Sequence, residues 1–147
     1  MRRRLAFYLL LAVFVLVVAA VVAGCGEDAQ SPTAIVESWS KAINASDNEA
    51  AANLFADDAR VIEDGQSVRL AGHDEALSFN ASLPCGGRIV EQALEGDEVT
   101  ATFALTRRPG HTCDGTGQTA VAVFRITDGK IALWHELPTP ELGTQSA

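Results

Sequence analysis

The stretch VFRITDGKIALWHEL, residues 123–137, decides the fold class of this chain. Apolar residues recur along both halves of the stretch, and Asp128-Gly129 stands between the halves. An Asp-Gly pair between two such runs is the strongest short-range signal for a two-residue hairpin turn. We therefore predict two antiparallel strands, over residues 120–127 and 130–137.

More strands are predicted upstream of this hairpin, and helices are predicted before them. Apolar residues alternate with threonines over residues 99–105, which is typical of a half-buried strand, and a weaker alternation covers residues 88–94. Apolar residues at helical spacing predict helices over 32–43 and 72–83. Helices followed by antiparallel strands define the α+β class.

The segment between the two long helices is expected to begin as a short helix. Ser46 and Glu49 fit a capping box that would open this helix, and Asp57-Asp58 would end it. A short strand is then predicted over residues 61–63, with a turn at Asp64-Gly65.

This order of elements resembles the SnoaL-like branch of the nuclear-transport-factor-2-like superfamily. The landmarks are LFADDARVIEDG at residues 54–65 and the hairpin at 123–137. The resemblance covers residues 32–138 and implies a curved antiparallel sheet wrapped around N-terminal helices, forming a cone with an internal pocket. Because the superfamily contains enzymes and many non-catalytic members, it predicts fold more than activity.

The N-terminus resembles a bacterial lipoprotein signal. Three arginines precede an uncharged run over residues 5–23, and the small residues Ala23 and Gly24 stand directly before Cys25. The resemblance implies cleavage before Cys25, acylation of its sulfur with chains such as palmitate, and a place on the extracytoplasmic face of the cell membrane. The alternative is an uncleaved signal-anchor helix. We thus expect a signal peptide (1–24), a tether (25–31), one domain (32–138) and a flexible tail (139–147).

The charge of the chain bears on its partners. Removal of residues 1–24 takes away three arginines and no acidic residue, so the net charge falls from −8 to about −11. Counterion release on nucleic acid requires clustered cations, which such a chain lacks, so we expect no nucleic-acid partner. The lipid anchor is the expected contact with the membrane.

Three cysteines are present. If Cys25 is lipidated, Cys85 and Cys113 remain as an even pair, and such pairs outside the cytoplasm are usually oxidised. The predicted hairpin near Gly96 also brings the regions of these two cysteines together. We therefore predict a disulfide between Cys85 and Cys113.

Two residues are candidates for catalysis. By alignment on Ala56-Asp57-Asp58-Ala59, Glu63 falls where ketosteroid isomerases keep their general base, and alternation puts it on the face of Val61. A carboxylate in an apolar pocket holds its proton more tightly, as a base acting near neutral pH requires. The alternative is a solvated glutamate at a strand end.

His135 is the second candidate. Simple alternation places it with Ile131 and Leu133, with Phe124 opposite Leu133, on the more apolar face of the hairpin. It would then be a pocket acid or base, and Glu136 would lie on the opposite face. The alternative is a histidine at the edge of the core.

Four aromatic residues are candidates for the lining of a ligand cavity, although aromatic residues on apolar faces also belong to ordinary cores. They are Trp39, Phe55, Phe79 and Phe103. No spacing of histidine, cysteine and acidic residues matches a strong metal site, so we expect neither a metal nor a cofactor.

Three functional hypotheses follow. The favoured one is a non-catalytic domain that binds a small apolar ligand or a protein partner. The second is a cofactor-independent isomerase, lyase or hydrolase that uses Glu63 and His135; against it, the only tyrosine is Tyr8, so the mature chain lacks a phenolic oxyanion donor. The third is a structural envelope module that assembles through its sheet, as a homodimer would.

Overall fold

The computed structural model describes residues 30–138, and within them the chain forms three helices and six strands. The predicted signal peptide, Cys25 and the predicted tail lie outside the described residues. Among the described residues, no helix is both long and apolar enough to cross a membrane. The helices are α2 (Pro32–Asn44), α3 (Asn48–Ala52) and α4 (His73–Ser82). The strands are β1 (Phe55–Glu63), β2 (Gln66–Arg69), β3 (Gly86–Glu95), β4 (Glu98–Thr106), β5 (Thr119–Thr127) and β6 (Lys130–Leu137).

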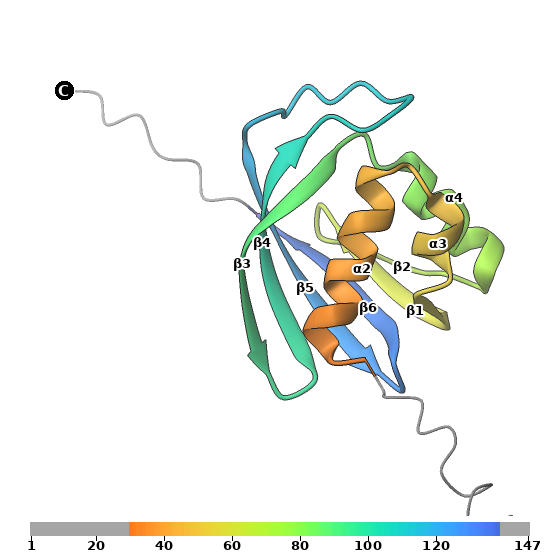
Figure 1. Cartoon of the computed structure of the whole chain (residues 1–147). Coiled ribbons are helices and arrows are strands. Elements are labelled where there is room, and N and C mark those ends of the chain that lie inside the picture. Colours follow the sequence, from red (N-terminus) through yellow and green to blue (C-terminus); the bar gives the residue numbers. More distant parts are fainter. Residues whose placement is uncertain (1–29, 139–147) are drawn as a thin grey trace, which may run out of the picture.

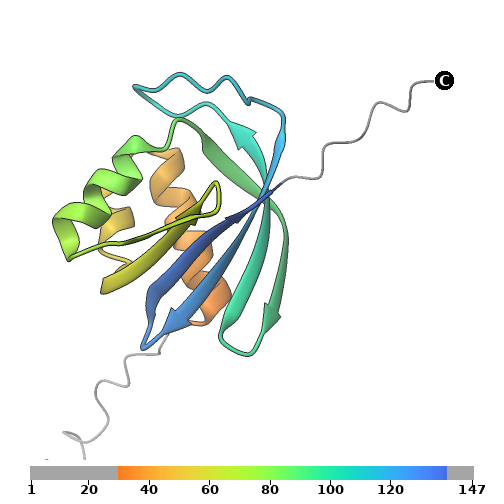
Figure 2. The same ribbon diagram turned by 180° about the vertical axis from the view of Figure 1, so that it is seen from behind.

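The six strands form one sheet in the order β2-β1-β6-β5-β4-β3. All neighbours are antiparallel except β1 and β6, which run parallel. The sheet curves around α2, and α3 and α4 lie on the same side near β1 and β2 (Figures 1 and 2). The predicted α+β class and the curved sheet around N-terminal helices are confirmed.

The segment after α2 differs from the expectation. Asp47, not Ser46, caps α3 by accepting a hydrogen bond from the backbone N–H of Ala50 at 3.0 Å. The helix ends early, and β1 already begins at Phe55, so Asp57 and Asp58 lie in a strand. The reason is long-range pairing, because Phe55 lies beside Ile131 of β6 and this contact overrides the local helical pattern.

A β-bulge in β6 changes which residues face the helices. Ile126 pairs with Ile131, as a two-residue turn requires, but Arg125 pairs with Leu133, so the register shifts by one residue at Ala132. Beyond the bulge every side chain faces the side opposite to the one expected. The predicted pairing of Phe124 with Leu133 is therefore wrong, because Phe124 lies opposite Trp134.

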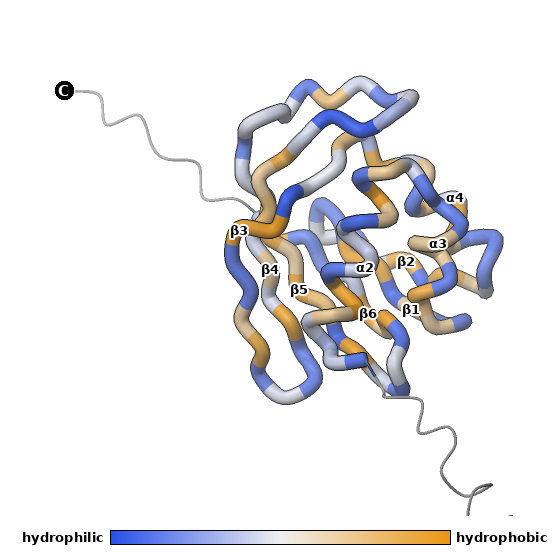
Figure 3. Tube along the Cα trace, viewed as in Figure 1, coloured by the Kyte–Doolittle hydropathy of each residue, from blue (hydrophilic) through white to orange (hydrophobic). Residues whose placement is uncertain are grey.

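Aromatic residues form the centre of the core between α2 and the concave side of the sheet. Figure 3 shows how apolar and polar residues alternate along the strands that curve around α2. The Trp39 ring lies 5.1 Å from that of Phe124 and 6.0 Å from that of Phe103, centroid to centroid. Trp134 continues the cluster toward Phe79, at 5.2 Å. Such edge-on contacts stabilise a core beyond the area they bury.

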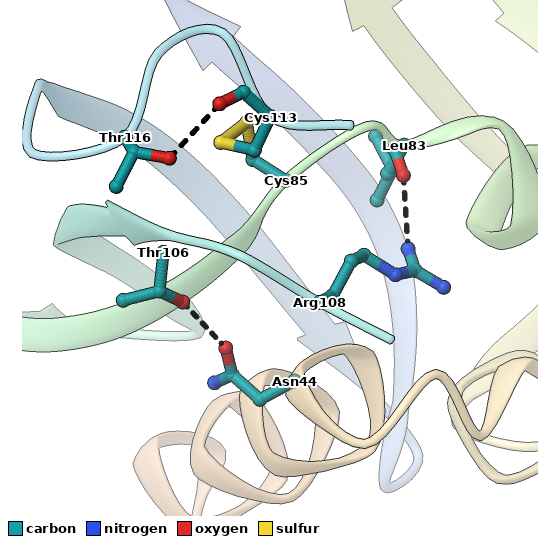
Figure 4. The surroundings of a disulfide bond; sticks show 7 residues. All are labelled: Asn44, Leu83, Cys85, Thr106, Arg108, Cys113 and Thr116. Carbon is teal, nitrogen blue, oxygen red and sulfur yellow. Dashed lines mark hydrogen bonds between the residues drawn. A yellow bond between two sulfur atoms is a disulfide. The ribbon is translucent and has the colours of Figure 1, made fainter. Parts of the chain in front are cut away.

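The predicted disulfide is confirmed. Cys85 and Cys113 are bonded, with their Cα atoms 4.8 Å apart (Figure 4). Cys85 directly precedes β3, and Cys113 lies in the long loop that follows β4. The bond therefore ties this loop to the start of β3.

A buried arginine holds the same end of the molecule together. Arg108 is 3% exposed, and its guanidinium donates to the backbone carbonyls of Asn80 and Leu83, each at 3.0 Å. Figure 4 shows the bond to Leu83. Its other donors reach Ser46 Oγ and Asn48 Oδ1. These contacts join the end of α4 to the start of α3.

Candidate functional site

A pocket of about 180 Å³ opens between α2 and the concave side of the sheet, at the end of the molecule that carries the disulfide. Its wall comes from α2, from the segment that leads into β3, and from the inner faces of the central strands. The lining residues are Trp39, Ser40, Ile43, Glu63, Leu83, Pro84, Cys85, Gly86, Gly87, Phe103, Leu105, Ala120, Val121, Ala122, Trp134 and Glu136. Most are apolar, which is typical of a site for a small organic molecule.

Three aromatic side chains form the inner wall, and each is buried. Trp39 comes from α2, Phe103 from β4 and Trp134 from β6. The Trp39 indole N–H donates to Asn80 Oδ1 at 2.8 Å, which fixes the plane of its ring. The Trp134 indole N–H is also buried, but it has no hydrogen-bond partner within residues 30–138. Because a buried donor without a partner costs free energy, this N–H is an unsatisfied polar group behind the aromatic wall.

Two adjacent residues hold the backbone close to α2. Gly86 and Gly87 begin β3, and the carbonyl of Gly87 accepts hydrogen bonds from Ser40 Oγ at 2.7 Å and Asn44 Nδ2 at 2.9 Å. An added Cβ on Gly87 would lie only 3.0 Å from the Phe103 ring. Glycine at these two positions therefore permits the close approach that closes this side of the pocket.

Two carboxylates stand on neighbouring strands at the pocket. In the parallel pair of β1 and β6, Val61 lies beside Trp134 and Ile62 beside His135. The next residues along the two strands are Glu63 and Glu136, and both line the pocket. Backbones of neighbouring strands are about 4.8 Å apart, and the negative charge of Glu63 acts on Glu136; these two residues are called the acidic pair.

Burial raises the pKa of the Glu136 carboxyl, and the negative charges of Glu63 and Asp64 raise it further. Partial removal from water disfavours the charged form, and so does a like charge on the next strand. Glu63 itself is exposed and stands at the rim of the pocket, on the same face as Val61 as predicted. Of the two carboxylates, that of Glu63 is exposed and that of Glu136 is partly shielded from solvent.

His135 does not meet Glu63 in this pocket. The bulge at Ala132 turns His135 to the convex side of the sheet, where it pairs with Val123. There it borders another hollow, together with Asp64 and Leu137; Glu136 borders both this hollow and the pocket. The predicted placement of His135 on the inner face is wrong, and so is that of Glu136 on the outer face, because the bulge exchanges the two.

The four predicted aromatic lining residues divide into two groups. Trp39 and Phe103 line the pocket between α2 and the sheet. Phe55 and Phe79 are in contact with each other, with ring centroids 5.9 Å apart, and they border two other hollows, of about 520 and 510 Å³ respectively. The aromatic pocket is the better candidate for an apolar ligand, because three buried aromatic residues line it.

Sequence reasoning missed Trp134 and Glu136 as pocket residues. A signal was available in the spacing of these two residues. Glu136 follows Trp134 by two positions in β6, and residues two apart share one face of a strand. The bulge hid this signal, because it reverses the face on which both residues lie. Within residues 30–138, no group of three or more histidine, cysteine or acidic side chains is arranged to hold a metal ion.

A curved, unclosed sheet around helices, with a pocket between them, defines the nuclear-transport-factor-2-like class. The solved structure of an inferred polyketide cyclase from Sinorhizobium meliloti is 24% identical and has a TM-score of 0.56; the match covers 70% of this chain and 93% of that one. An inferred ketosteroid isomerase from Kribbella flavida is 20% identical, with a TM-score of 0.57 and coverage of 78% and 84%. A nuclear-transport-factor-2-like protein of unknown function from Cytophaga hutchinsonii is 14% identical, with a TM-score of 0.61 and coverage of 75% and 91%. At these identities the likeness shows the fold alone.

The family itself is shown by the sequence. The model of the SnoaL-like domain matches residues 36–134, which is more than half of the chain. The chain belongs to the SnoaL-like domain family. No curated protein matches the sequence.

Proposed function

We propose that this domain binds a small, mainly apolar molecule in the pocket between α2 and the sheet, without transforming it. The observation that carries the proposal is the pocket wall, in which three buried aromatic residues surround a volume of about 180 Å³. Engineered apolar cavities of about 150 Å³ bind benzene, so a molecule with one ring matches the size of this pocket.

The tryptophans provide a direct test, because the sequence contains two and both line the pocket. We would titrate the full chain in dodecyl maltoside with 2-phenylethanol and record tryptophan fluorescence, with free tryptophan in micelles as the blank. A saturable change is expected. Fluorescence that follows the free-tryptophan blank would contradict binding in the pocket.

A matched pair of variants locates the binding site. Ala120→Leu adds three carbon atoms to a pocket-lining side chain, whereas Ala104→Leu makes the same change on the outer face of β4, between the inward Phe103 and Leu105. We expect the first variant to lose binding at least about tenfold and the second to keep it. Equal affinities for both variants would place the ligand elsewhere.

We also propose that the chain is anchored to the membrane by a lipid. A lipid on Cys25 would hold the domain at the extracytoplasmic face of the membrane, and two or more acyl chains give stable residence there. The residues before Cys25 support it, as does the disulfide, which is typical of exported proteins. Intact mass of the membrane fraction tests it: an acylated chain that begins at Cys25 is expected, and an unmodified chain that retains Met1 would contradict it.

A second candidate is cofactor-independent acid–base catalysis, and one observation favours it. Burial and the neighbouring charge of Glu63 raise the pKa of Glu136. A carboxyl group with a raised pKa is a common general acid or base in enzymes. Glu136 would then act as the pocket acid or base, which is the role predicted for His135. Molecules that co-purify with the chain would be incubated with it in D2O. Deuterium uptake or a change in mass that Glu136→Gln abolishes would indicate catalysis; recovery of the unchanged molecule would indicate binding alone.

A further inference from the structure

We propose that the ligand of this pocket is a small amphipathic amine, whose ammonium group lies between Glu63 and Glu136 and whose apolar part lies against the aromatic wall. The inference rests on the proposed function, because it assumes that the pocket is a binding site. It adds the chemical class of the ligand.

The charges of the pocket carry the argument. The charged residues in its lining are Glu63 and Glu136, and the other charge that acts on Glu136 is that of Asp64, which is also negative. Two carboxylates on neighbouring strands repel each other, and the lining supplies no cation to offset this repulsion. A ligand with an ammonium group would supply one.

The apolar wall supports the same class. Ammonium groups are attracted to the faces of aromatic rings, most strongly to tryptophan, and Trp39, Phe103 and Trp134 line the pocket. A wall that combines carboxylates and aromatic faces fits a molecule that is apolar but carries a positive end.

A metal ion is a poorer match for the acidic pair. Calcium takes six to eight oxygen ligands, and magnesium needs a nearly regular octahedron of oxygens. Around Glu63 and Glu136 the lining is mainly aromatic and aliphatic. An organic cation requires no such shell, because its apolar part is stabilised by the same wall.

The direction in which the pKa of Glu136 is shifted also fits this inference. Its carboxyl holds a proton more tightly than usual because of burial and of the nearby negative charges. A bound ammonium group offsets those charges and favours the ionised carboxylate, so the amine should bind more weakly as the pH falls and Glu136 takes up a proton.

The test compares three molecules of similar size and different charge. They are 2-phenylethylamine, which is a cation at pH 7, 2-phenylethanol, which is neutral, and 3-phenylpropanoate, which is an anion. Each is titrated into the full chain in dodecyl maltoside, with tryptophan fluorescence as the readout and protein-free micelles as the blank for partitioning. Charge-assisted contacts should make the cation bind about tenfold more tightly than the alcohol, and the anion should bind more weakly than the alcohol.

Variants separate the contributions of the two carboxylates. We expect Glu63→Gln and Glu136→Gln each to reduce the preference for the cation by about threefold, and the double variant to bind the amine and the alcohol alike. Glu95→Gln changes the charge equally at an exposed position far along β3, and it should keep the full preference.

The outcomes distinguish the two proposals. If the alcohol binds in the pocket as tightly as the amine, the amine inference is overturned while the proposed function stands. If the amine preference survives in the double variant, the inference is also overturned, because the carboxylates do not cause it. If none of the three molecules changes the fluorescence, both proposals fail.

Discussion

Arg108 is a buried cation whose replacement should destabilise the end of the domain that carries the disulfide. Within residues 30–138 it has no salt-bridge partner, and its Nη1 donates to the carbonyls of Asn80 and Leu83 at the end of α4. Burial lowers the pKa of the guanidinium, which means that this environment opposes the charge. The hydrogen bonds and the favourable position at a helix C-terminus must therefore offset that penalty.

The magnitude follows from the acceptors that Arg108→Ala would leave behind. Each shielded carbonyl without a partner costs about 1–3 kcal/mol, and the shortened side chain leaves a cavity, while relief of the buried charge partly compensates. We expect a net loss of about 3 kcal/mol in the free energy of unfolding. For a domain of this size that lowers Tm by about 12 °C.

Thermal unfolding followed by circular dichroism measures this loss, with Arg107→Ala as the control. Arg107 is the adjacent arginine in sequence and is exposed, so its replacement should change the free energy of unfolding by less than about 0.5 kcal/mol. Equal Tm values for Arg108→Ala and Arg107→Ala would refute the reasoning, because they would show that the hydrogen bonds merely balance the cost of burial.

Three further predictions concern the disulfide, Glu136 and Gly86. The bond between Cys85 and Cys113 closes a loop of 28 residues. Its reduction, or the double variant Cys85→Ala with Cys113→Ala, should lower the free energy of unfolding by about 3–4 kcal/mol. Denaturant titration measures this loss, and an unchanged midpoint would contradict the prediction. The pKa of Glu136 is raised above its ordinary 4.5, so the folded state loses stability as the pH rises and this carboxyl ionises. Glu136→Gln should therefore raise Tm at pH 7.5 but not at pH 4. The control Glu95→Gln should leave the dependence of Tm on pH unchanged. An identical Tm difference at both pH values would speak against the pKa shift. Gly86→Ala should cost about 1–3 kcal/mol, because the new Cβ would overlap Asn44 Oδ1 and lie 2.9 Å from Thr106 Oγ1; full stability of this variant would show that α2 can move away from β3.

The elements with clear periodicity were predictable from the sequence. The hairpin at Asp128-Gly129, the strand over 99–105 and the helix that begins at Pro32 each have a local signal, and the structure contains them at nearly those bounds. The disulfide was predictable as well, because it follows from the hairpin and the cysteine count. Local chemistry decided the hairpin, the strand and the helix, so local reasoning was sufficient for these three.

The pocket was less predictable, because pairing across the sheet decides it. No local signal marks the bulge at Ala132, yet that one residue determines whether His135 or Glu136 faces α2. Phe55 was likewise expected in a helix, and its strand conformation depends on the distant Ile131. The acidic pair forms only when β1 and β6 are parallel neighbours, and these strands are far apart in the chain.

The most direct test of a ligand-binding pocket is a titration observed at the two indole N–H groups. Trp39 and Trp134 give the two indole signals of a ¹⁵N-labelled full chain in detergent, and the Trp134 N–H has no partner within the described residues. Addition of 2-phenylethanol should shift both signals saturably, with one dissociation constant, and Ala120→Leu should suppress the shifts while Ala104→Leu preserves them. Indole signals that stay in place in the folded protein throughout the titration would contradict the account.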